Sequence, residues 1–183
     1  RYDKILDINE CHIQEKLCNK ILNLVRTEAL NNNLKPYDNK TNNGYLRHLV
    51  LRYGYNTGEL MVNLVTSYEN TKLLDPIIKA LLNQFPDITS IVNNINTRRA
   101  DVAYGESEII LHGTPAIREK LNDITFEISA NSFFQTNTEQ AEKLFQVVLD
   151  NAGLTGKEIV FDLFCGTGSI ALFLARFAKK IYG

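Results

Sequence analysis

The stretch "IVFDLFCGTGSIALFLA", Ile159–Ala175, is typical of a β-strand that passes through a glycine-rich loop into an α-helix. Gly166, Gly168 and Ala171 fit the pattern G-x-G-x-x-G/A, which binds nucleotide-like cofactors when it stands between a strand and a helix. Glycines serve here because the chain must turn sharply and let a ligand lie against bare backbone. The stretch therefore predicts the opening of a doubly wound α/β domain. The glycines alone do not distinguish NAD, FAD and S-adenosylmethionine.

Asp162, which stands four residues before Gly166, narrows the choice of cofactor. A carboxylate at the end of the strand would repel a pyrophosphate on the loop, whereas it would attract the cationic amino-acid head of S-adenosylmethionine. We therefore favour S-adenosylmethionine, and with it a methyltransferase. Two alternatives stay open: Asp162 could cap the loop without touching a ligand, or the segment could be a strand-to-helix turn with no ligand at all.

Residues 1–130 predict a central α/β domain, because helical and strand-like patterns succeed one another along them. Ile13, Leu17 and Ile21 recur at helical spacing in the first of these patterns, and the turn "YNTG" predicts a hairpin. The expected elements are helices at 9–31 and 73–86 and strands at 45–54, 59–68, 88–96, 107–113 and 124–130.

Residues 131–183 predict the first part of a Rossmann-like methyltransferase domain, since a helix, a strand, the glycine loop, a second helix and the start of a strand follow in order. Asn137 can cap the first helix, with Gln140 as its capping-box partner, and Gly153 can end it. The fold class expected for the whole chain is therefore α/β, with a central domain followed by an incomplete second domain.

The two ends of the sequence suggest a piece of a longer protein. It begins with Arg1 rather than Met and closes on "KKIYG", which resembles the start of a strand. An acidic residue that holds the cofactor ribose is expected roughly 20 residues past the glycine loop, beyond Gly183. We therefore expect weak or no cofactor binding by these 183 residues alone.

Composition sets broader limits. The formal net charge is −1, from 20 basic and 21 acidic residues, so bulk charge gives no support to a nucleic-acid partner, although a local patch could bind one. Three cysteines, odd in number and widely spaced, argue against a disulfide framework and favour a reducing, cytoplasmic compartment. The sequence shows no apolar run long enough to span a membrane.

Two stretches carry a family resemblance. "ISANSFFQTNTEQAEKLF" (Ile128–Phe145), followed by "VFDLFCGTGSIALFLA", closely resembles the RNA uracil-5-methyltransferases, which form 5-methyluridine in 23S ribosomal RNA and transfer RNA. "GYLRHLVLR" and the run from "RRADVAYGESEIILHG" to "AIREKL" resemble the central domain of that family. The resemblance implies transfer of a methyl group from S-adenosylmethionine to C5 of a uridine, after a cysteine thiolate has added to C6. It implies that the nucleophile and the general base both lie outside this chain, so the 183 residues are expected to be inactive.

The resemblance also implies which residues meet the ligands. Gln135 is expected where cofactor and target base meet, unless it is only a surface amide near a helix cap. The expected cofactor-binding residues are Gln135, Asp162, Phe164, Gly166, Gly168 and Ser169. Phe133 and Phe134 could stack on a flipped base or pack in the core. Arginines, above all Arg47 and Arg52 and further Arg98 and Arg99, could contact RNA phosphates or could simply be solvated charges.

The cysteines raise two further questions. Cys165 stands in the glycine loop with no general base near it in sequence, so we interpret it as structural rather than nucleophilic. Cys11 resembles the last ligand of a [4Fe–4S] cluster in some family members, although a cluster needs three more thiolates from elsewhere. The alternative for Cys11 is a small apolar residue at the start of a helix.

RNA is the expected partner, with 23S rRNA preferred to tRNA, and no membrane partner is expected. An unpaired sheet edge in the incomplete domain predicts self-association of the chain. Two other functions stay open: a dinucleotide-dependent oxidoreductase and a non-catalytic RNA-binding module.

Overall fold

The computed structural model describes residues 6–99 and 102–183. The chain divides into two compact units, the first formed by the residues up to Tyr53 with Leu60–Pro115 and the second by Gly54–Glu59 with Ala116–Gly183. Each unit is described by itself. The domain boundary predicted after residue 130 falls within the second unit, and as a family domain boundary it stays a prediction.

The first unit contains a four-stranded sheet in the order β1-β2-β3-β4. β1 and β2 form the predicted antiparallel hairpin, β2 and β3 run parallel, and β3 and β4 are antiparallel. The parallel step requires a crossover, which the predicted second helix supplies. The elements are α1 (Lys16–Asn31), β1 (Leu46–Tyr53), β2 (Leu60–Thr66), η1 (Thr71–Leu74), α2 (Asp75–Gln84), β3 (Ser90–Ile95) and β4 (Ser107–Gly113).

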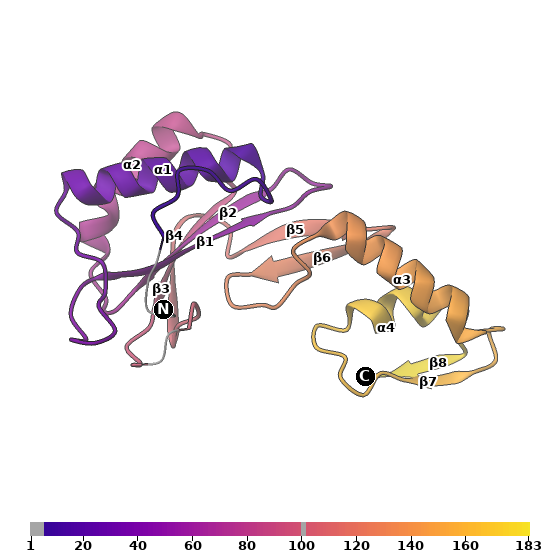
Figure 1. The fold of residues 1–183 in the computed structure, drawn as a ribbon. Coiled ribbons are helices and arrows are strands. Elements are labelled where there is room, and N and C mark those ends of the chain that lie inside the picture. The colour runs from indigo at the N-terminus through magenta and orange to yellow at the C-terminus, as the bar shows by residue number, and fades with distance from the viewer. Residues whose placement is uncertain (1–5, 100–101) are drawn as a thin grey trace. The chain divides into compact units, whose positions relative to one another are not determined.

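The helices α1 and α2 lie together over one face of this sheet (Figure 1). Their apolar stripes meet the alternate residues of the strands that point to the same side. The core between the two layers contains Ile21 and Val25 of α1, Leu60, Val62 and Leu64 of β2, Ile77 and Leu81 of α2, and Ile91 of β3.

The start of α1 differs from the sequence-based expectation. The helix begins at Lys16 rather than near residue 9, and Ile13, expected on the buried face, is 97% exposed. The side chain of Asn19 explains the difference, because it accepts a hydrogen bond from the Cys11 N–H (2.8 Å) and donates one to the Cys11 carbonyl (3.0 Å). These bonds hold the preceding segment against the first turn, where an Asn side chain competes with helical backbone bonding.

The second unit combines an antiparallel hairpin, β5–β6, with the helices α3 and α4 and a two-stranded parallel sheet, β7–β8. The order of strand, glycine loop, helix and strand matches the expectation, and the α/β fold class is confirmed. The strand β5 was not predicted. The elements are β5 (Ala116–Leu121), β6 (Ile124–Ser129), α3 (Thr138–Ala152), β7 (Ile159–Phe161), α4 (Ser169–Leu174), η2 (Ala175–Phe177) and β8 (Lys180–Tyr182).

The boundaries of α3 follow the predicted capping. The Asn137 side chain accepts the N–H of Gln140 at 3.0 Å, and Gly153 closes the helix in the left-handed conformation with φ of 60°. Phe145 of α3 packs against Phe173 of α4, with ring centroids 5.8 Å apart, and both side chains are buried.

Among the described residues, no helix has the length and apolar character needed to cross a bilayer.

Candidate functional site

The glycine loop joins β7 to α4 at the carboxyl end of the parallel pair β7–β8. Gly166 and Gly168 have φ of 55° and 74°, which are conformations that favour glycine. The Gly168 N–H donates to the Cys165 carbonyl at 2.8 Å, which closes the turn. A Cβ placed on either glycine would have no atom within 4 Å. Open space therefore lies over the loop backbone, at the sheet edge where open α/β sheets bind ligands.

Asp162 directly follows β7, and its N–H donates to the Tyr182 carbonyl at 2.8 Å. This bond continues the parallel ladder by one residue and fixes the backbone at Asp162. The chain at Gly183 passes very close by, because a Cβ added there would lie 2.9 Å from the Cβ of Cys165 and 3.8 Å from that of Asp162. Asp162 and Cys165 therefore flank the end of β8.

Cys165 is half-buried, and its Sγ lies 3.8 Å from the Gly166 carbonyl oxygen. Its side chain packs against the backbone of Gly183. These contacts are consistent with the predicted structural role of Cys165, which stays a prediction.

The aromatic residues around the loop are open to solvent. Phe164, the predicted aromatic contact for the cofactor, is 98% exposed. The Phe161 ring stacks on Tyr182, with centroids 5.3 Å apart and planes inclined by 13°. Ser169, the first residue of α4, is half-buried. The loop thus presents an aromatic side chain beside bare glycine backbone.

The segment between β6 and α3 carries the other predicted residues of the site. Gln135 is exposed, and Phe133 is 71% exposed. Phe134 instead packs against Phe126 of β6, with ring centroids 5.5 Å apart. Of the two phenylalanines, only Phe133 therefore offers a free ring face, whereas Phe134 follows the core-packing alternative. Gln135 lies in the same unit as the glycine loop, and a shared ligand contact stays a prediction.

Glu119 of β5, which was not predicted as a functional residue, holds the end of the segment between β6 and α3. Its carboxylate is buried and accepts hydrogen bonds from the backbone N–H groups of Tyr55 (2.6 Å), Asn56 (3.0 Å) and Lys120 (2.8 Å). It also accepts the Thr138 hydroxyl at 2.7 Å, at the first residue of α3. Four donors satisfy the carboxylate without a cation. Glu119 could have been found as a charged residue at an inward position of a strand with alternating burial. It was missed because β5 was not predicted.

A second pair of residues reinforces the same hairpin. The Glu59 carboxylate accepts both the Nε (2.8 Å) and the backbone N–H (2.6 Å) of Arg118. Burial opposes ionisation of Glu59, but the contacts with Arg118 outweigh it and lower the pKa of this carboxyl. Both residues therefore stay charged and hold the turn of residues 54–59 against β5.

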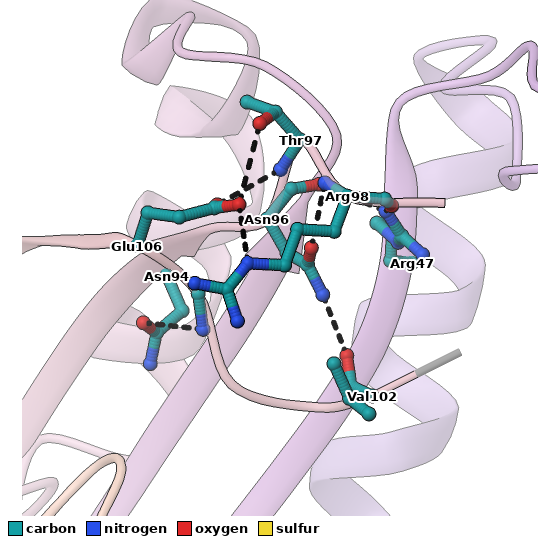
Figure 2. Close-up of polar contacts among 8 residues, drawn as sticks. Arg47, Asn94, Asn96, Thr97, Arg98, Val102 and Glu106 are labelled. Atoms are coloured by element: carbon teal, nitrogen blue, oxygen red, sulfur yellow. Dashed lines mark hydrogen bonds and ion pairs between the residues drawn. The ribbon is translucent and has the colours of Figure 1, made fainter. Parts of the chain in front are cut away.

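The predicted phosphate-binding arginines belong to the first unit. Arg47 lies beside Asn96 and Arg98 (Figure 2) and donates through Nη1 to the carbonyls of Asn96 (2.9 Å) and Arg98. Its guanidinium lies 4.2 Å from the Tyr37 ring centroid. Arg47 is thus engaged within its own unit. Burial lowers the pKa of the half-buried Arg52. A phosphate contact by either residue stays a prediction.

Comparison with known proteins identifies relatives of the chain. No family model matches the chain. It is 42% identical over all 183 residues to a protein of Chlorobaculum tepidum named "Uncharacterized RNA methyltransferase", and 39% identical over 183 residues to one of the same name from Clostridium acetobutylicum. The chain is homologous to RNA methyltransferases. It spans 38% and 40% of the length of these two relatives.

A solved structure gives the same result for this RNA methyltransferase homologue. The chain is similar to the Pyrococcus abyssi tRNA (uracil-54, C5)-methyltransferase, crystallised in complex with S-adenosyl-L-homocysteine, with a TM-score of 0.77 and 35% identity. The match covers 94% of this chain and 40% of that one. The similarity to RNA methyltransferases inferred from "SFFQTN" and "DLFCGTG" is therefore confirmed, as is the fold.

The predicted metal ligand, Cys11, is half-buried in the segment held by Asn19 before α1. Within the described residues, no group of three or more His, Cys, Asp or Glu side chains could hold a metal ion. A role for Cys11 in a [4Fe–4S] cluster therefore depends on ligands from outside these residues and stays a prediction.

Proposed function

We propose that this chain forms part of an S-adenosylmethionine-dependent RNA methyltransferase that methylates C5 of a uridine. The observation that carries the proposal is the open glycine loop with Asp162 at the carboxyl end of two parallel strands. Homology to RNA methyltransferases supports RNA as the substrate class. Solubility and a cytoplasmic location are part of the same proposal.

The residues of the loop fit this cofactor. Positive φ and open space at Gly166 and Gly168 form a cradle that any Cβ would fill. The Asp162 carboxylate would hold the ammonium of the amino-acid head by a charge-assisted hydrogen bond. The exposed Phe164 ring would cover one face of the ligand, and Ser169 would offer a hydroxyl beside it. The bound cofactor supplies a methyl group that its sulfonium makes electrophilic.

The uracil would bind near the segment between β6 and α3. The exposed Phe133 ring offers a stacking face for a base taken out of its stack, and the Gln135 amide can donate to or accept from the uracil edge. C5 of a neutral uracil is a poor nucleophile, so a covalent adduct at C6 would activate it. We assign neither the nucleophile nor the base to a residue of this chain, and propose that the 183 residues alone do not transfer methyl groups.

The test is the RNA of cells that lack the gene. Digestion and mass spectrometry of ribosomal and transfer RNA should show the loss of 5-methyluridine at one site, and we expect that site in 23S rRNA in preference to tRNA. Restoring the gene should restore the nucleoside. Unchanged 5-methyluridine in both RNA classes would contradict the proposal.

A binding measurement separates the cofactors. Calorimetry on the full gene product should show binding of S-adenosylhomocysteine but not of NAD or FAD. Asp162→Asn keeps the size of the side chain and removes its charge, so we expect roughly tenfold weaker binding. Leu154→Ala, outside the loop, is a matched control that should bind as the unaltered protein does. Tight NAD binding would instead indicate the oxidoreductase alternative.

A further inference from the structure

A hollow of about 310 Å³ lies on the first unit, formed by the loop before β1, the end of β2 and the turn after β3. This volume is at the lower end of the roughly 300–1,000 Å³ found for small-ligand sites. We call it the Tyr68 hollow. Among the described residues, its lining carries one cation and no carboxylate. The residues used in the argument below are Tyr37, Asn42, Asn43, Tyr68, Thr97 and Arg99.

A polar network fixes Thr97 and Arg98, directly before Arg99 in the chain (Figure 2). The buried Asn96 accepts the Arg98 N–H at 3.0 Å and donates to the Val102 carbonyl at 2.8 Å. Glu106 accepts the Thr97 N–H at 3.0 Å and pairs with the Arg98 Nε at 2.9 Å. These bonds hold Asn96, Thr97 and Arg98 in place before any ligand arrives, and the Glu106 carboxylate pairs with Arg98.

The aromatic wall is fixed from behind. Tyr68 is 48% exposed, and its ring packs on Tyr45 with centroids 4.9 Å apart. Tyr45 is buried and donates its hydroxyl to the Asn70 carbonyl at 2.7 Å. Burial raises the pKa of Tyr45 to about 12, so it stays neutral. Tyr68 can therefore keep its contact with Tyr45 while the exposed part of its ring faces the hollow.

The amide side of the hollow offers hydrogen-bonding groups. Asn42 and Asn43 are exposed, and the Tyr37 hydroxyl donates to the Asn42 Oδ1 at 3.1 Å. The nearby carboxylate of Asp38 is occupied by its own loop, because it accepts the N–H groups of Lys40 (2.7 Å) and Thr41 (3.4 Å). Asparagine amides can pair with a base edge.

We propose that the Tyr68 hollow binds one nucleotide of single-stranded RNA, at a site separate from the glycine loop. The base stacks on Tyr68, the asparagine amides meet its edge, and Arg99 contacts the adjoining phosphate. An aromatic platform beside a cation is how single-stranded nucleic acid is held without strong sequence preference. The inference rests on the proposed function, since that makes RNA the partner.

The experiment measures fluorescence anisotropy of a labelled pentauridylate with the 183-residue chain over a series of salt concentrations. Tyr68→Ala should weaken binding about tenfold, and Tyr68→Phe, which keeps the ring, should leave it unchanged. Arg99→Ala should reduce the slope of log K against log salt by about 0.7, the value for one phosphate on a single strand. Tyr55→Ala, an exposed tyrosine of the second unit, is the matched control and should bind normally. Circular dichroism confirms folding of each variant.

Equal binding by the Tyr68→Ala and Tyr55→Ala variants would overturn the proposal. The proposal would also be overturned if tripolyphosphate displaced the labelled oligonucleotide as well as the unlabelled oligonucleotide does, because the hollow would then bind anions without recognising a base. This test can be separated from that of the proposed activity. If cells lacking the gene lose 5-methyluridine but Tyr68→Ala does not change oligonucleotide binding, only the proposal about the hollow is contradicted. If the oligonucleotide binds at Tyr68 but cells lacking the gene keep their 5-methyluridine, only the proposed activity is contradicted.

Discussion

At the scale of single residues, the buried carboxylate of Glu119 shows how a polar group stabilises the second unit. It receives four hydrogen bonds from three separate segments, the turn of residues 54–59, β5 and the start of α3. A buried carboxylate is tolerated only when donors replace its hydration. Glu119 therefore fixes the end of the segment that carries Phe133 and Gln135.

Replacement of Glu119 by glutamine should lower the free energy of unfolding of the second unit by about 1–3 kcal/mol. The amide keeps one acceptor oxygen and turns an NH₂ group toward backbone donors, so at least one buried donor loses its partner. Urea denaturation monitored by NMR signals of the second unit measures the change. Glu127→Gln, on the exposed side of β6, should cost nothing measurable. Equal stability of the two variants would contradict the role of Glu119.

Glu158, just before β7, predicts a pH effect. Hydrogen bonds from the Thr155 hydroxyl (2.6 Å) and the Thr155 N–H (2.8 Å) lower the pKa of Glu158 from its ordinary value of 4.5 to about 2. Because the pKa is depressed in the folded state, its stabilising contribution is complete above pH 4.5 and is lost as the pH falls toward 2.

The Thr155→Val variant removes only the hydroxyl bond, so it should raise the pKa of Glu158 toward its ordinary value. A carboxyl ¹³C NMR titration measures this directly. The exposed Thr125→Val is the control and should leave the titration of Glu158 unchanged. Titration of Glu158 at 4.5 in the unaltered protein would show that these bonds do not persist in solution.

At the scale of elements, the helix α3 should depend on its cap. Asn137→Ala leaves the N–H of Gln140 without its acceptor and should lower the free energy of unfolding by about 1 kcal/mol. Asn137→Asp keeps an oxygen at the same place, and its charge suits a helix N-terminus, so it should restore stability. Thermal unfolding compares the variants. An alanine variant as stable as the aspartate variant would show that the cap contributes nothing.

The elements that were predicted correctly are those whose signals are local. α3 has both caps and an apolar stripe in its own sequence, and the hairpin β1–β2 has alternation and a turn. The start of α1 was wrong because Ile13 fits the helical period, while the side chain of Asn19 binds the segment before the helix. β5 escaped notice because a charged residue at an inward position resembles a break in the alternation.

The same distinction applies to the candidate site. The conformations of Gly166 and Gly168 and the position of Asp162 at a strand end follow from a motif whose geometry is local. The hydrogen bonds of Arg47 to carbonyls some 50 residues away could not be predicted in this way, because they depend on the pairing of distant strands. The Tyr68 hollow was missed for the same reason, since its lining comes from three segments of the chain.

At the scale of the whole molecule, near-neutral charge and exposed apolar surface act together. The net charge of −1 provides little repulsion between copies of the chain. Among the described residues the sheet β7–β8 has two strands. Apolar side chains of β7 and of the loop that follows it are open to solvent, with Phe161 at 65% and Leu163 at 82% exposure. Exposed strand edges with apolar neighbours favour pairing with another chain.

The 183-residue chain should therefore associate with itself in a concentration-dependent way, measurable by sedimentation velocity or light scattering. Leu163→Lys places a charge in this apolar surface but outside both strands, so it should weaken association without unfolding the sheet. Leu30→Lys alters another exposed leucine, on α1 (72% exposed), and is the matched control. Because Leu30 belongs to the first unit rather than to the sheet β7–β8, this variant should associate as the unaltered chain does. Association that survives Leu163→Lys, or that Leu30→Lys abolishes, would place the contact elsewhere than at β7–β8.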